Sequence, residues 1–247
     1  MMFRNTFIGI LIVLAIWEAI AMAGIFSPIF FASPLEVFRE APHMIHEKAF
    51  QEDVASTIGR VLASLAISAV IGIPIGIAIG YFARFYSYFT EILDFFRSIP
   101  PIVIYPLLMI SLGPGDVSRI GTAVFGSIAV ILLLTSKGVY QQDSTRRDFY
   151  KSRGATTFQI IREIVVYEGL PHIMTGLRTA ASLSLIVIIV TEMLFGGESG
   201  LGARVQQVQI TSNIPDLFFT IIVIGLLGLC LNKLLIYVEE RLVTWKS

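Results

Sequence analysis

Long apolar runs are the feature that most constrains the fold of this chain. Six windows in its 247 residues reach the length of roughly 20 apolar residues that a helix needs to cross the hydrocarbon of a bilayer. Hydrophobic residues make up 55% of the chain and charged residues only 15%, with a mean hydropathy of +0.79, whereas a soluble domain has roughly 25% charged residues. The sequence therefore predicts an all-α integral membrane protein, a single polytopic domain over residues 1–247.

Turn-forming sequences separate the apolar runs, notably Gly-Pro-Gly-Asp at 113–116 and a glycine-rich stretch at 196–200. The first run could instead be a cleavable signal peptide, because Arg4 precedes it and small residues lie near its end. It is longer than the usual apolar region of a signal peptide, so we expect a retained span. The expected transmembrane helices are 6–26, 55–82, 86–112, 118–137, 172–195 and 214–238.

The placement of Lys and Arg in short loops predicts the orientation, because cytoplasmic loops are enriched in both residues. With six spans, both termini and the loop 138–171 lie on the richer side, and we expect that side to be cytoplasmic, in the inner membrane of a bacterium or archaeon. The formal net charge is zero and there is no basic tail, so nucleic acid is not an expected partner. The basic residues on the richer side are Arg4, Arg84, Arg146, Arg147, Lys151, Arg153, Arg162, Arg241 and Lys246, against Arg39, Lys48, Arg119 and Arg204 on the other.

The second expected span carries a small residue at every fourth position. This spacing produces a flat stripe that lets another helix approach closely. We interpret the stripe as a packing seam within the chain, with a subunit interface as the alternative. Its members are Ser64, Ser68, Gly72, Gly76 and Gly80.

The third expected span contains charged residues and is interrupted by prolines. Asp94 and Arg97 are three residues apart and can pair on one face of a helix. Ionisable residues within a span usually face the bundle interior or a wet cavity, and broken helices can line such a cavity. The pair therefore either lines a translocation path or serves as a buried structural ion pair. The candidate residues for the path are Asp94, Arg97, Ser98, Pro100, Pro101 and Glu192.

The loop between the fourth and fifth expected spans has a helix–glycine–helix pattern. Thr156 and Gln159 have the spacing of a capping box. Apolar residues then recur at Phe158, Ile161 and Val165 with the spacing of an amphipathic helix, and Ile160 and Ile164 lie beside them. We expect Gly154 to separate this helix from the preceding one and Pro171 to begin the fifth span. Such a helix either lies in the lipid interface or docks its apolar side into a protein groove.

This loop resembles the cytoplasmic loop of binding-protein-dependent ABC importer permeases. Asp148, Gly154 and Ile164 stand where that pattern has an acidic residue, a glycine and an isoleucine. The sequence departs from the pattern at two positions that are usually alanine and at Val166-Tyr167, which replaces a Leu-Pro, although a second Leu-Pro follows. By this resemblance 148–166 is a cytoplasmic coupling segment, and the residues implied in ATPase coupling are Asp148, Phe149, Tyr150, Gly154, Phe158, Ile161, Ile164, Leu170 and Pro171.

Further motifs resemble the nitrate, sulfonate, taurine and bicarbonate permease group. They are Ser-Pro-Leu-Glu-Val at 33–37, Arg-Ser-Ile-Pro-Pro at 97–101, Thr-Gly-Leu-Arg at 175–178 and Glu-Met at 192–193, followed by Ser-Gly-Leu-Gly at 199–202. The resemblance implies an ATP-driven importer of a small oxyanion that works by alternating access. The implied partners are a second permease copy, an ATPase dimer that holds ATP and Mg²⁺, and an extracytoplasmic solute-binding protein. A pyrimidine vitamin precursor or another small organic solute is the alternative substrate.

Two other classes of protein compete with this interpretation. The chain has no G-x-x-x-x-G-K-[ST] phosphate loop, so we expect ATP to be hydrolysed on a partner chain and no cofactor in this one. It has no H-E-x-x-H motif either, and we interpret His43 and His46 as solvated loop residues, so no metal site is expected. Gly-Glu-Ser-Gly at 197–200 has the form of a rhomboid-protease nucleophile motif, but no histidine follows it that could act as its base. An ATPase-independent secondary transporter or channel would leave the amphipathic loop without a role.

Overall fold

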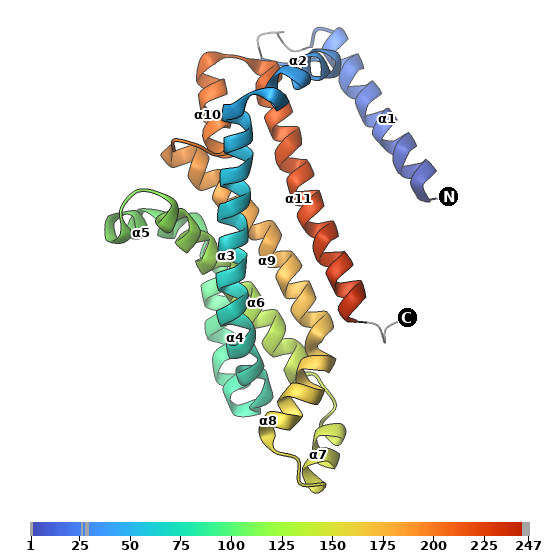
Figure 1. The fold of residues 1–247 in the computed structure, drawn as a ribbon, viewed down its shortest axis with the longest axis vertical. Coiled ribbons are helices and arrows are strands. Elements are labelled where there is room, and N and C mark those ends of the chain that lie inside the picture. Colours follow the sequence, from blue (N-terminus) through green and yellow to red (C-terminus); the bar gives the residue numbers. More distant parts are fainter. Residues whose placement is uncertain (1, 26, 28–29, 244–247) are drawn as a thin grey trace. The chain divides into compact units, whose positions relative to one another are not determined.

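The computed structural model describes residues 2–25, 27 and 30–243 (Figure 1). Every regular element within these residues is helical, which confirms the all-α prediction. The elements are α1 (Met2–Met22), α2 (Pro34–His46), α3 (Lys48–Tyr81), α4 (Ala83–Ser98), η1 (Pro101–Ile104), α5 (Tyr105–Leu112), α6 (Asp116–Tyr140), α7 (Ser144–Ser152), α8 (Thr157–Ile160), η2 (Ile161–Val165), α9 (Val166–Phe195), α10 (Leu201–Thr211) and α11 (Ile214–Leu242).

Four helices in the described part of the chain are long and apolar enough to cross a membrane. They are α3, α6, α11 and the continuous helix Thr157–Phe195, which joins α8, η2 and α9. A fifth candidate is the pair Ala83–Ser98 and Pro101–Leu112, which is bent by 80°. The break lies at the Pro100–Pro101 pair, where the missing N–H groups of proline interrupt the helical ladder. Phe7–Met22 is a shorter apolar helix, so the six-span count stays a prediction.

The chain divides into two compact units, and α3, α9 and α11 each contribute to both. One unit combines the chain up to Thr57 with Glu192–Leu227, and we call it the first unit. The second unit combines Ile58–Thr191 with the chain from Gly228 onward. The expectation of one polytopic domain stays a prediction.

In the second unit, the glycines of the α3 stripe pack against α6, and Ser64 of the same stripe hydrogen-bonds Ser184 of α9. A Cβ added to Gly72 would lie 3.0 Å from Cγ2 of Ile131, and one added to Gly76 would lie 2.8 Å from Cβ of Thr135. The contact at Gly76 is closer than real Cβ atoms come and the one at Gly72 is closer than most, so glycine lets the two helices approach. The stripe is therefore an internal packing seam, as interpreted from the sequence.

The helix Thr157–Phe195 runs without interruption through Pro171, so Pro171 does not stand in the first turn of a helix as expected; where the fifth span begins stays a prediction. The cause is packing on both sides of the proline. Ile164 and Val165 before it and Ile173 after it are buried in one cluster with Val139 of α6. This shared burial stabilises the helix against the loss of one backbone hydrogen bond at the proline.

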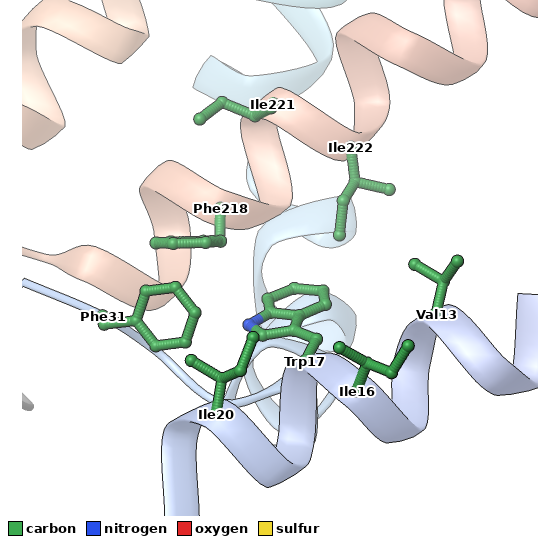
Figure 2. A pocket seen from close by; sticks show the side chains of 8 residues that line it. All are labelled: Val13, Ile16, Trp17, Ile20, Phe31, Phe218, Ile221 and Ile222. Carbon is green, nitrogen blue, oxygen red and sulfur yellow. The ribbon is translucent and has the colours of Figure 1, made fainter. Parts of the chain in front are cut away.

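The first unit contains α1, α2 and α10 together with the adjoining ends of α3, α9 and α11. Trp17 of α1 stacks on Phe218 of α11, with ring centroids 5.5 Å apart, and its Nε1 donates a hydrogen bond to the Ala32 carbonyl. Figure 2 shows the apolar groove around this contact, which has a volume of about 430 Å³. The groove is lined by Val13, Ile16, Trp17, Ile20, Phe31, Phe218, Ile221 and Ile222.

Candidate functional site

The segment between α6 and α9 forms two short helices joined by a glycine turn. Asp143 caps α7 by accepting a hydrogen bond from the Thr145 N–H at 2.9 Å, and this bond holds the pKa of the Asp143 carboxyl below its usual range. Gly154 has φ +83°, a left-handed conformation that favours glycine. Thr156 and Gln159 form the expected capping box: Thr156 Oγ1 accepts from the Gln159 N–H, and Gln159 Oε1 accepts from the Thr156 N–H. The predicted helix–glycine–helix form is confirmed, and its coupling role stays a prediction.

The apolar stripe of the second helix differs from the one read from the sequence. Ile160, Ile164 and Val165 are buried, whereas Phe158 is 71% exposed. The reason is that Ile161–Val165 is a π-helical turn, in which the Val166 N–H donates to the Ile161 carbonyl. A π-helical turn holds more residues than an α-helical one, so a stripe counted at the α-helical spacing does not continue across it. Ile164, a predicted coupling residue, lies in the core of the second unit.

Three aromatic side chains of α7 and α8 are exposed, and we call this set the coupling surface: Phe149, Tyr150 and Phe158. The two helices contact each other. The Arg153 guanidinium lies 4.6 Å from the centre of the Phe149 ring, and Arg146 pairs with Glu168. The coupling surface therefore combines apolar rings with basic groups, a composition suited to contact with another protein.

The other predicted coupling residues are spread along the segment. Asp148 is exposed on α7, with its Oδ1 4.0 Å from Lys151 Nζ. Ile161, Leu170 and Pro171 are partly buried along the continuous helix.

Asp94, Arg97 and Ser98 lie together at the end of α4, directly before the proline break. Arg97 Nε is 3.2 Å from Asp94 Oδ1, and the Ser98 hydroxyl donates to the Asp94 carbonyl at 2.8 Å. The side chains of Arg97 and Asp94 are 52% and 48% exposed. Pro101 packs on α6, where a Cβ added to Gly126 would lie 2.5 Å from the Pro101 ring. The ion pair is therefore an open one at the bend between α4 and α5.

Glu192, the remaining candidate for the path, is fully buried in the first unit. Its carboxylate accepts hydrogen bonds from the Thr57 hydroxyl at 2.9 Å and from the Gly202 N–H at 3.0 Å. Arg97 belongs to the second unit and pairs there with Asp94. The structure thus brings together the α4 residues and places Glu192 among different partners.

Three side-chain oxygens accept the first N–H groups of α10, and we call this arrangement the α10 anchor. Asp53 accepts from Gly200 at 2.7 Å, Thr57 accepts from Leu201 at 2.9 Å, and Glu192 accepts from Gly202. These bonds satisfy donors that a helix N-terminus leaves without intrahelical partners. Gly200 has φ +131°, and a Cβ there would lie 2.5 Å from the Glu192 carboxyl carbon.

Arg204 of α10 extends this network. Its guanidinium lies 2.6 Å from Glu47, 3.0 Å from Asp216 and 3.5 Å from Asp53, next to a cavity of about 210 Å³. Burial lowers the pKa of Arg204, but hydrogen bonds to Asp216 and Glu47 outweigh this effect and raise it. Sequence reasoning missed the network. Its only trace there is a Ser-Gly-Leu-Gly motif and acidic residues far apart in the chain.

The fold and these features define a polytopic helical membrane protein with an exposed loop surface. Residues 72–244 match the family described as "Binding-protein-dependent transport system inner membrane component". The chain belongs to this family of inner-membrane components, so it is an ABC transporter permease. A permease subunit is not itself catalytic.

Relatives with full-length similarity support this membership. A probable ABC transporter permease protein of Brucella abortus (strain 2308) is 27% identical over 87% of this chain and 85% of its own length. The taurine transport system permease protein TauC of Escherichia coli (strain K12) is 25% identical over 95% of this chain and 86% of its own length. The nitrate import permease protein NrtB of Synechocystis sp. is 26% identical over 96% of this chain and 88% of its own length.

A chain of the inward-facing MetNI methionine ABC transporter has a similar fold, with a TM-score of 0.68 and 20% sequence identity. The similarity covers 77% of this chain and 94% of that chain. At this identity the likeness concerns the fold.

Proposed function

We propose that this permease imports a small oxyanion by alternating access and that α7 and α8 receive the motion of a separate ATPase. One observation carries the proposal: α8 has two apolar faces. Ile160 fills the internal one, while Phe158 is exposed together with the aromatic rings of α7. Grouped exposed apolar side chains are a feature of protein-binding surfaces. The coupling surface is therefore better suited to a groove on a partner protein than to exposure to water.

The partners follow from the family and from its named relatives. We propose an ATPase dimer that holds ATP and Mg²⁺, a second permease copy, and an extracytoplasmic solute-binding protein. The taurine and nitrate permeases among the relatives favour an oxyanion as the substrate. Contact with the ATPase requires the coupling surface to be cytoplasmic, and with six spans we propose that both termini are cytoplasmic as well.

The α4 end is the proposed part of the translocation path in this chain. The Asp94–Arg97 ion pair is half exposed, although the two helices around it are apolar. Exposing these charges to lipid would cost free energy, so the pair should face a water-filled path. Arg97 supplies the positive charge that would favour an anion, and the bend at Pro100 and Pro101 gives it space. Glu192 would contribute indirectly, because it holds the start of α10.

The test is uptake into proteoliposomes that contain the permease, its ATPase and its binding protein, with taurine, nitrate and bicarbonate as probes. Uptake of at least one probe should require ATP and stop with vanadate. The double substitution Phe149→Ser and Phe158→Ser should reduce binding of the ATPase by roughly tenfold or more, because exposed aromatic anchors dominate many interfaces. The control is Phe38→Ser on α2, a ring that is 55% exposed outside the coupling segment.

Two results would contradict the proposal. Uptake that persists without the ATPase and follows an ion gradient would assign the chain to secondary transport. Unchanged ATPase binding by the double variant would show that the coupling surface does not carry the contact.

A further inference from the structure

We propose that Gln142 is a positioning residue that holds the π-helical turn and thereby sets the orientation of the coupling surface. This inference rests on the proposed function of α7 and α8. Gln142 lies between α6 and α7, outside the segment that the sequence singled out. Its Nε2 donates a hydrogen bond of 2.9 Å to the carbonyl of Val165, the last residue of the π-helical turn.

The surroundings of this amide are shaped to receive it. A Cβ added to Gly169 would lie 3.2 Å from Gln142 Nε2 and 3.5 Å from Cγ2 of Val139. Gly169, one helical turn after Val165, therefore leaves the space in which the Gln142 amide lies. The Gln142 Oε1 atom is buried and has no hydrogen-bond partner within the described residues. A buried acceptor without a partner lowers the stability of the fold. Glutamine would therefore be a poor residue at this position if it were only a structural linker.

The backbone of Gln142 is joined to α7 as well. Its carbonyl accepts a hydrogen bond from Arg147 Nη2 at 3.3 Å, and the Arg147 guanidinium lies 5.9 Å from the centre of the Tyr81 ring at the end of α3. One residue thus contacts α7 through its backbone and the π-helical turn through its side chain. These contacts link α7 and the π-helical turn that continues α8 to the residues that follow α6.

The π-helical turn gives this contact a mechanical consequence. A π-helical turn contains one residue more than an α-helical turn closed by i→i+4 bonds, so its conversion to α-helix would rotate α8 about its axis relative to α9. Ile160, Ile164 and the exposed Phe158 would then change the directions in which they point. By binding the Val165 carbonyl, Gln142 ties the end of the π-helical turn to the residues that follow α6, and so fixes the direction in which Phe158 faces the ATPase.

The test compares Gln142→Leu with the wild type in proteoliposomes that contain the complete transporter. The measured quantity is the number of ATP molecules hydrolysed per molecule imported, with the best-transported of taurine, nitrate and bicarbonate as the probe. Loss of one hydrogen bond should raise this ratio about fivefold. Gln141→Leu is the matched control, because Gln141 is the exposed neighbour.

A second variant separates positioning from stability. Gly169→Ala should displace the Gln142 amide and raise the same ratio, although alanine favours helix more than glycine does. In the Gln142→Leu background the Gly169 substitution should add little, since the shared contact is already lost.

The inference is overturned if Gln142→Leu keeps the wild-type ratio, or if uptake and hydrolysis fall in proportion together with thermal stability. Fully additive effects of the two substitutions would also overturn it. Failure of the proposed function is distinguishable, because wild-type uptake would then proceed without ATP.

Discussion

The α10 anchor and the coupling surface use side chains in opposite ways. In the anchor, the buried oxygens of Thr57 and Glu192 and the partly buried carboxylate of Asp53 are matched to donors of the same unit. In the coupling surface, Phe149 is half exposed and Phe158 is mostly exposed, so much of each ring is left uncovered by the described residues. A closed polar network stabilises the unit that contains it, whereas an open apolar surface gains stability only when a partner covers it. The comparison separates a part held by internal hydrogen bonds from a part that we propose to contact a partner.

The largest expected effect is in the anchor, from Gly200→Ala. The added Cβ would meet the Glu192 carboxylate at a backbone conformation that favours glycine, so we expect a loss of roughly 2–5 kcal/mol of stability. Thermal unfolding of the purified protein in detergent measures it. Gly196→Ala is the control, because Gly196 also has positive φ but its added Cβ would have nothing within 4 Å. Equal melting of the two variants would show that the anchor is not tightly packed.

An intermediate effect is expected in the coupling segment, from Gly154→Pro. Proline fixes φ near −65°, whereas Gly154 has φ +83°, so the turn between α7 and α8 must change. Nothing lies within 4 Å of an added Cβ, so the protein should still fold and insert. We expect uptake to fall about tenfold while ATP hydrolysis continues.

Gly154→Asn is the matched control for that variant, because asparagine tolerates the left-handed conformation. It should retain coupling. Normal uptake by Gly154→Pro would remove the turn from the coupling mechanism and weaken the contrast between the two regions.

The smallest effect on stability is expected for Arg97→Met. An exposed ion pair contributes only about 0–1 kcal/mol, so the melting temperature should change little. If Arg97 lines the path, oxyanion uptake should fall several-fold while the affinity of the binding protein stays the same. Arg84→Met, at an exposed basic residue near the start of α4, controls for the loss of charge. A loss of stability without a selective change in uptake would assign the pair a structural role instead.

The parts of this molecule that could be predicted from sequence depend on local rules. Apolar run length predicts membrane helices, the Thr156–Gln159 spacing predicts a capping box, and small residues four apart predict a packing seam. Each of these follows from the geometry of a single helix. The Pro171 boundary could not be predicted in this way, because buried residues on both sides of the proline keep the helix continuous.

The functional candidates divide along the same line. The exposed aromatic residues of α7 and α8 were indicated by their position in the loop motif. The role of Glu192 was not, because its partners Thr57 and Gly202 meet it only in the folded unit. Gln142 was missed for the same reason, since its side chain reaches a carbonyl 23 residues further along the chain.

The sequence by itself determined that this protein folds in a membrane, that it is helical and to which family it belongs. Hydropathy, turn-forming residues and the order of motifs are all local features of the chain. Only the tertiary structure decided which face of α8 is buried, where the polar residues of α3 and α9 find partners, and how Gln142 meets the π-helical turn. These outcomes depend on contacts between distant segments, and the free energy of such a contact is set by the burial and geometry of both partners.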